Sequence, residues 1–149
     1  TDDPAEGEAF TAARRSVFPA VQAMGSLLLE DVGVPMQQLP ALITGVEAIA
    51  EDCDVLICTV AHAGDGNTHP LIVFDPTDPD MTDRAHTAFA RVMELAIALG
   101  GTISGEHGIG RLKRDWLPSQ LGEDVMELNR RIKTALDPLG ILNPGAVLS

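Results

Sequence analysis

Two histidines flank a glycine-rich turn signal near the middle of this chain. The apolar run 55–60 leads into the segment 61–70, which reads Ala-His-Ala-Gly-Asp-Gly-Asn-Thr-His-Pro, and a second apolar run, 71–74, leads out of it. Two such runs joined by a short Gly-Asp-Gly-Asn segment are typical of a β-hairpin. We expect His62 to lie opposite His69, so that both imidazoles share one face of the sheet and could hold a metal ion. This register also pairs Val60 with Leu71 and Cys58 with Val73.

A third candidate group lies in the glycine-rich segment 104–110, which contains Glu106 and His107. Two histidines and one carboxylate make a three-ligand site, and a site of this kind keeps positions open for water or substrate. Adjacent residues in extended chain point in different directions, so Glu106 could bind metal while His107 reaches a substrate from another side. A free imidazole beside a metal is a suitable general base near neutral pH.

Each of these signals also has a purely structural interpretation. Asp65-Gly66 is most often only a turn, and a lone histidine at a strand end is usually structural or exposed. Glycine-rich loops more often serve backbone geometry than chemistry, and Gly108-Ile109-Gly110 does not complete a dinucleotide fingerprint. Arg14 and Arg15 are by default a solvated helix face.

Composition limits the classes of function. The chain has 149 residues, which suits one domain or part of a larger protein, and 45% of them are hydrophobic. A net charge of −12 argues against nucleic acids and anionic membranes as partners. Cys53 and Cys58 do not have the spacing of a zinc knuckle, and free thiols fit a reducing compartment, which we expect to be the cytoplasm. The sequence shows no signal peptide or membrane span, and its start without methionine suggests an excised or processed piece.

The periodicity predicts an α+β fold. We expect a loose acidic segment over residues 1–9 and one domain over 10–149, with an antiparallel sheet covered by helices on one face, a ferredoxin-like sandwich. Both faces of the hairpin are apolar, so the uncovered face should meet another domain or subunit. The expected elements are a helix from Phe10 to Met24 broken or kinked at Pro19, a strand over 27–34, and helices beginning at Pro40, over 80–99, and over 123–136 with Val125, Leu128, Ile132 and Leu136 inward.

Three motifs together carry a family resemblance. They are His62-Ala-Gly-Asp-Gly-Asn-Thr-His-Pro70, Ser104-Gly-Glu-His-Gly-Ile-Gly110 and Leu136-Asp-Pro-Leu-Gly-Ile-Leu-Asn-Pro-Gly145, with a weaker match around Arg14. In this order and spacing the chain resembles the C-terminal domain of FAD-linked 2-hydroxy acid dehydrogenases, which include glycolate oxidase, D-lactate dehydrogenase and D-2-hydroxyglutarate dehydrogenase. The resemblance implies a partial, C-terminal domain of a two-domain flavoenzyme whose FAD is held mainly by a domain outside this chain.

The resemblance also implies roles for particular residues. His62, His69 and Glu106 would ligate zinc or manganese, and His107 would take the hydroxyl proton of a small 2-hydroxy acid while a hydride leaves for the flavin. Arg14 and Asn67 would contact the substrate, and Asn143 and Gly105 would lie near the cofactor. The expected partners are a flavin-binding domain or subunit and a peripheral electron-transfer partner.

Two other functions stay open from the residues alone. One is a non-catalytic metal-binding remnant or regulatory module. The other is a non-haem iron enzyme, because two histidines and a carboxylate also form the ligand triad of that class.

Overall fold

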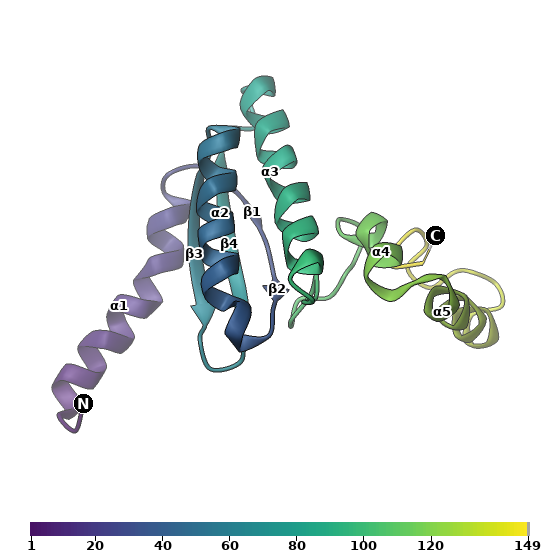
Figure 1. Cartoon of the computed structure of the whole chain (residues 1–149), viewed down its shortest axis with the longest axis horizontal. Coiled ribbons are helices and arrows are strands. Elements are labelled where there is room, and N and C mark those ends of the chain that lie inside the picture. The colour runs from purple at the N-terminus through teal and green to yellow at the C-terminus, as the bar shows by residue number, and fades with distance from the viewer. Residues whose placement is uncertain (149) are drawn as a thin grey trace.

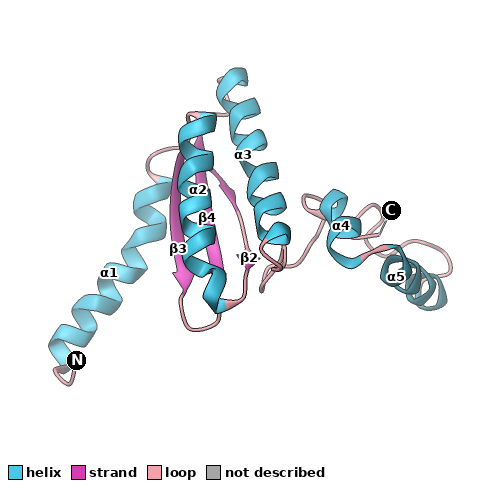
Figure 2. Cartoon of the chain, in the orientation of Figure 1, coloured by secondary structure: helices cyan, strands magenta, loops and turns pink. Residues whose placement is uncertain are grey.

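The computed structural model describes residues 1–148 and has the mixed helix-and-strand fold that the sequence predicts (Figures 1 and 2). Its β-α-β-β-α core follows the expected element order. In chain order the elements are α1 (Pro4–Gln22), β1 (Ser26–Leu29), β2 (Val32–Gly33), η1 (Met36–Gln38), α2 (Leu39–Cys53), β3 (Leu56–His62), β4 (Asn67–Phe74), α3 (Pro79–Ala98), η2 (Arg114–Trp116), α4 (Leu117–Leu121) and α5 (Glu123–Leu136).

Strand β4 is the centre of a four-stranded antiparallel sheet. Strand β3 pairs along one side of it, and β1 and β2 pair in sequence along the other. The two short strands keep one register, because continuing from the Leu29–Leu71 pair places Glu30 opposite Pro70 and Asp31 opposite His69 before Val32 meets Thr68.

Pro70 explains why the single strand predicted over 27–34 is interrupted at Glu30 and Asp31. A proline in a central strand removes one ladder hydrogen bond because it has no N–H. The Glu30 N–H still donates to the Pro70 carbonyl at 2.9 Å, but Pro70 cannot return the bond to the Glu30 carbonyl. The Glu30 carbonyl oxygen, which therefore has no partner in the ladder, lies 3.4 Å from Nδ1 of His69.

The two faces of the sheet are covered unequally. Helices α2 and α3 pack on one face and bury the main core, which includes Val32, Leu42, Val46, Ile72, Phe89 and Val92. The other face carries a much smaller cluster of Val21, Leu71 and Val73 beneath the end of α1. Helix α1 therefore covers part of the face that was expected to be free of helices in this chain, and leaves the rest of it open.

Helix α1 differs from the sequence prediction at both ends. It begins at Pro4, inside the segment expected to be loose, and Asp3 caps it by accepting a hydrogen bond from the Ala5 N–H at 2.8 Å. It also continues through Pro19 to Gln22, so Pro19 does not break the helix, and the alternative of a kink there stays a prediction. Helix α3, in contrast, starts and ends within one residue of the predicted bounds, with Asp78 as its N-cap.

Helix α5 has the predicted bounds, but its predicted burial was wrong. Figure 1 shows α4, α5 and the C-terminal tail to one side of the sheet and its covering helices. Met126 is the buried residue of α5. The apolar stripe of the helix lies on another side, away from the core. The stripe expected inward is exposed: Val125 by 42%, Leu128 by 54%, Ile132 by 50% and Leu136 by 78%.

Over residues 1–148, no helix combines the length and the apolar character needed to cross a membrane.

Candidate metal and substrate site

The hairpin supplies His62 and His69 from neighbouring strands, with a register two residues away from the predicted one. His62 lies opposite Asn67, and His69 lies opposite Val60. The turn is shorter than expected because Asn67 and Thr68 extend the ladder, and the His62 carbonyl accepts hydrogen bonds from the N–H groups of Asp65 and Gly66 at 3.2 and 3.1 Å. Gly66 adopts φ +81°, which closes the turn and suits a residue without Cβ.

The shift in register does not separate the two histidines. Side chains alternate along a strand, so a slip of two residues returns each one to its original face. The His62 and His69 rings meet edge to face with centroids 5.3 Å apart. The prediction that these two imidazoles converge on one face is therefore confirmed, although its pairing was wrong.

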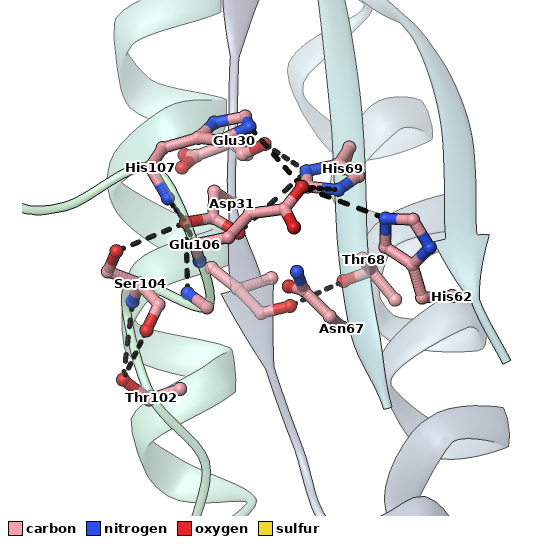
Figure 3. Close-up of polar contacts among 12 residues, drawn as sticks. Glu30, Asp31, His62, Asn67, Thr68, His69, Thr102, Ser104, Glu106 and His107 are labelled. Atoms are coloured by element: carbon pink, nitrogen blue, oxygen red, sulfur yellow. Dashed lines mark hydrogen bonds and ion pairs between the residues drawn. The ribbon is translucent and has the colours of Figure 1, made fainter. Parts of the chain in front are cut away.

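Glu106 and His107 reach the same point from the loop that follows α3 (Figure 3). One carboxylate oxygen, Glu106 Oε1, lies 3.2 Å from His69 Nε2 and 3.7 Å from His62 Nε2. The same oxygen lies 3.8 Å from His107 Nε2, and the His107 ring stacks on His69 with centroids 4.9 Å apart. Glu106 and His107 thus converge on one centre rather than approaching it from separate sides.

The donor set fits a divalent cation. The ligand atoms of His62, His69 and Glu106 all lie within 4.8 Å of one another. Two imidazole nitrogens and a carboxylate oxygen suit zinc, manganese or iron(II). His69 is only 12% exposed, whereas the other two side chains are 41% and 55% exposed, so a bound ion would keep an open side.

Two cavities border this cluster. One, of about 310 Å³, lies between α1 and the open sheet face; it is lined by Arg14, Arg15, Val17, Phe18, Leu29, Val60, His69, Leu71 and His107. Arg15 also forms an ion pair with Glu8 at 3.5 Å. Arg14 has no ion pair within the described residues 1–148, which leaves its guanidinium available to a carboxylate ligand.

The second cavity, of about 550 Å³, is walled by backbone. Its lining residues are Gly33, Val34, Pro35, Asp65, Asn67, Gly100, Gly101, Thr102, Gly105 and Glu106. Asn67 is 9% exposed, and its Oδ1 is buried without a hydrogen-bond partner among residues 1–148. Gly105 packs so closely on the Asn67 amide that a Cβ there would overlap it, which explains the need for glycine at this position.

Asn143 is not brought into the cluster. It lies in the C-terminal tail with φ +47°, and its carbonyl accepts a hydrogen bond from the Ala146 N–H at 3.1 Å. Arg111 and Arg114 hold this tail through the carbonyls of Pro144 and Gly145 at 3.1 and 2.7 Å. The expected cofactor role of Asn143 stays a prediction.

Three buried charged residues beside the site were missed by the sequence reasoning: Glu30, Asp31 and Lys113. Lys113 Nζ donates to the carbonyls of Asp31 and Ile103, each at 2.8 Å, and lies 3.7 Å from Glu30 Oε2. The available signal was a pair of acidic residues in the middle of the apolar segment 27–34, since carboxylates are rarely buried without a specific partner.

The pKa values of the adjacent carboxylates Glu30 and Asp31 shift in opposite directions. Burial raises the pKa of Glu30 to about 8, against the opposing charge of Lys113. Burial would also raise the pKa of Asp31, but hydrogen bonds from the N–H groups of His107 and Glu106, the Ser104 hydroxyl and the Lys113 charge together hold it below its usual range. Burial lowers the pKa of Lys113. Asp31 is therefore the carboxylate that stays ionised.

Comparisons with known proteins give a consistent result. The family described as "FAD linked oxidases, C-terminal domain" matches residues 1–147. The glycolate oxidase subunit GlcD of Bacillus subtilis is 40% identical over 145 residues, which cover 97% of this chain and 31% of that protein. GlcD of Escherichia coli K12 is 40% identical over 144 residues, 96% of the chain and 29% of GlcD. A probable mitochondrial D-lactate dehydrogenase of Danio rerio is 41% identical over 118 residues, 79% of the chain and 24% of that protein. The chain thus spans about a third of the length of the GlcD proteins.

Proposed function

Because the chain belongs to the family of FAD-linked oxidase C-terminal domains, we propose that it is the substrate- and metal-binding part of an FAD-dependent 2-hydroxy acid dehydrogenase. The membership confirms the resemblance drawn from the three motifs, and the names of the relatives support an FAD-linked oxidoreductase. The finer proposal, a glycolate or D-lactate type substrate, rests on one observation: a carboxylate and two imidazoles meet within 3.7 Å beside a cavity that two arginines line.

His62, His69 and Glu106 would hold a divalent metal, zinc or manganese. When bound, such an ion supplies Lewis-acid chemistry, lowering the pKa of a coordinated alcohol. The chain contributes three ligand atoms held around one point. It also leaves open the smaller cavity, which Arg14 and His69 line. An α-hydroxy acid presents a hydroxyl and a carboxylate together, which suits a metal bordered by a cationic side chain.

His107 is the proposed general base. His107 lines the smaller cavity, and its Nε2 lies 3.8 Å from the Glu106 carboxylate. From there its imidazole would accept the proton of a substrate hydroxyl. FAD, held by a separate domain, would supply the acceptor for the hydride that leaves Cα. The 2-hydroxy acid would become the 2-oxo acid by giving its hydroxyl proton to His107 and a hydride to the flavin.

The remaining site residues take supporting roles in this proposal. Arg14 binds the substrate carboxylate, and Asn67, which lines the larger cavity, contacts the substrate. Gly105 lines the larger, glycine-walled cavity, which gives a flat cofactor ring close access to backbone. Asn143 would join the cofactor side when the tail meets the flavin-binding domain.

The proposed partner is a flavin-binding domain or subunit. Two observations support it: the relatives are about three times as long as the matched segment, and α5 exposes the apolar stripe Val125, Leu128, Ile132 and Leu136. A contiguous apolar helix face in contact with water favours an interaction surface. The electrons then pass to a peripheral electron-transfer partner. The free thiols of Cys53 and Cys58 are consistent with a reducing compartment, which we propose is the cytoplasm.

The test replaces the matched segment of the Bacillus subtilis GlcD protein with this chain and measures dye-linked oxidation of glycolate and D-lactate. We expect turnover from the hybrid, none from the isolated chain with added FAD, and zinc or manganese in the purified protein. Robust turnover by the isolated chain would overturn the dependence on a flavin domain. Iron as the bound metal would favour the non-haem iron alternative.

A further inference from the structure

The loop that carries Glu106 and His107 has no helix or strand to hold it. It follows an isolated bridge between Gly33 and Thr102 and precedes the short helix η2. A single carboxylate oxygen, Asp31 Oδ2, accepts hydrogen bonds from the three successive N–H groups of residues 105, 106 and 107 at 2.9, 2.9 and 2.7 Å. It also accepts one from the Ser104 hydroxyl at 3.1 Å, as Figure 3 shows.

The hydrogen bonds to Asp31 fix the loop conformation that the site needs. Successive N–H groups that converge on one anion form a nest, and the anion holds the backbone of all three residues at once. The Ser104 hydroxyl extends the arrangement by accepting the Gly108 N–H at 2.7 Å. Without the carboxylate, three successive N–H donors of the loop would lose their shared partner.

The second oxygen of Asp31 faces the hairpin. Asp31 is fully buried, and its Oδ1 has no hydrogen-bond partner within residues 1–148. This oxygen lies 3.8 Å from His69 Nδ1, and the Glu30 carbonyl lies 3.4 Å from the same nitrogen. Both neighbours of Nδ1 are acceptors, which favours the ring proton on that nitrogen. The competing acceptor is Glu106 Oε1, which lies 3.2 Å from Nε2 on the other side of the ring.

This tautomer is the one that metal binding through Nε2 requires. Histidine ligands commonly donate their other ring N–H to a carboxylate or a backbone carbonyl, which fixes the ring and raises its basicity. The sheet register produces the contact, because Asp31 is opposite His69 and Pro70 leaves the Glu30 carbonyl free.

We propose that Asp31 is the positioning residue of this site: one oxygen holds the loop bearing Glu106 and His107, and the other sets the tautomer of His69. The assignment deepens the proposed function, because it concerns the ligands of the same metal. A competing role exists, since Asp31, His69 and His107 could themselves surround a cation. In that case His69 Nδ1 would be a ligand and would carry no proton when the ion is bound.

The test uses Asp31→Asn, which keeps the size and one acceptor oxygen. The Asn oxygen can still serve the loop, which turns the side-chain NH₂ towards His69 Nδ1 and forces that nitrogen to become an acceptor. The tautomer is read in a Glu106→Ala background, which removes the competing acceptor at Nε2. Nitrogen NMR of this metal-free protein at pH 8, above the ordinary imidazole pKa of about 6.5, should show His69 protonated at Nδ1 when Asp31 is intact and at Nε2 when Asp31→Asn is added. In the protein that keeps Glu106, Asp31→Asn should lower zinc affinity roughly 10–100-fold.

A matched control is Ser104→Ala, which removes one donor to Asp31 but leaves the carboxylate. It should speed amide hydrogen exchange in the loop and leave the His69 tautomer unchanged. The proposal is overturned if His69 carries its proton on Nε2 in Glu106→Ala with Asp31 intact. It is also overturned if adding Asp31→Asn to that background gives a folded protein that keeps the proton on Nδ1. A wild type that binds no zinc would refute the metal function, while the tautomer measurement still decides the role of Asp31.

Discussion

The two halves of the candidate site are held by different means. His62 and His69 lie on adjacent strands, and a continuous ladder from Leu56–Val73 to His62–Asn67 fixes their separation. Glu106 and His107 lie on an irregular loop whose N–H groups depend on one buried carboxylate. The hairpin half should therefore tolerate many single changes, whereas the loop half should fail when a few specific contacts are lost.

The largest expected effect falls on catalysis. His107→Ala should reduce kcat of the GlcD hybrid by about 10²–10⁴-fold, because it removes the proposed general base. Zinc affinity should change little, since His107 is outside the proposed ligand set. Steady-state kinetics and calorimetry on the same preparation separate the two roles. A proportional loss of zinc binding would instead make His107 a ligand.

Lys113→Met should be the most destabilising change near the loop half. It leaves the carbonyls of Asp31 and Ile103 without their charged donor and removes the cation beside the ionised, buried Asp31 carboxylate. Breaking a buried pair on one side typically costs about 3–5 kcal/mol. Urea unfolding measures the cost. Arg84→Met is the matched control, because the Arg84–Asp54 pair is exposed and should contribute about 0–1 kcal/mol.

Glycine-to-alanine changes compare the two halves directly. At Gly105 a Cβ would overlap the Asn67 amide, and overpacking of this kind typically costs about 1–3 kcal/mol. At Gly64, in the hairpin turn, nothing lies within 4 Å of the added Cβ. We expect Gly105→Ala to lower both stability and zinc affinity and Gly64→Ala to leave both near wild type. Equal effects at the two positions would remove the contrast between the halves.

The pH dependence of stability tests the buried pair of carboxylates. Folding raises the pKa of Glu30 from 4.5 to about 8, so between these values the folded protein keeps a proton that the unfolded chain has lost. Stability should therefore fall as pH rises from about 5 to 8, by at most about 1.4 kcal/mol per pH unit. In Glu30→Gln this slope should flatten. An unchanged slope in urea melts across this range would place its origin elsewhere.

Local features were predicted from the sequence more accurately than contacts between distant segments. The bounds of α3 and α5 and the convergence of His62 with His69 were predicted because periodicity and alternation are local properties. The hairpin register was wrong by two residues, because turn length depends on how Asp65 and Gly66 hydrogen-bond.

Two further errors have a common origin in tertiary structure. The inward face of α5 was predicted from its apolar stripe, but periodicity shows that a helix has an apolar face and not what covers it. Asp31 was missed because its importance arises from a loop more than 70 residues away in sequence, where each hydrogen bond to it begins at a backbone N–H that no side-chain pattern reveals.

Zinc titration of the chain by calorimetry tests the central claim most directly. We predict one high-affinity ion per chain, lost in both His62→Ala and Glu106→Ala, although these residues come from the two different halves. His86→Ala, which removes an exposed histidine on α3, should bind zinc like the wild type. Unchanged binding in either His62→Ala or Glu106→Ala, with the fold intact, would contradict a shared metal site.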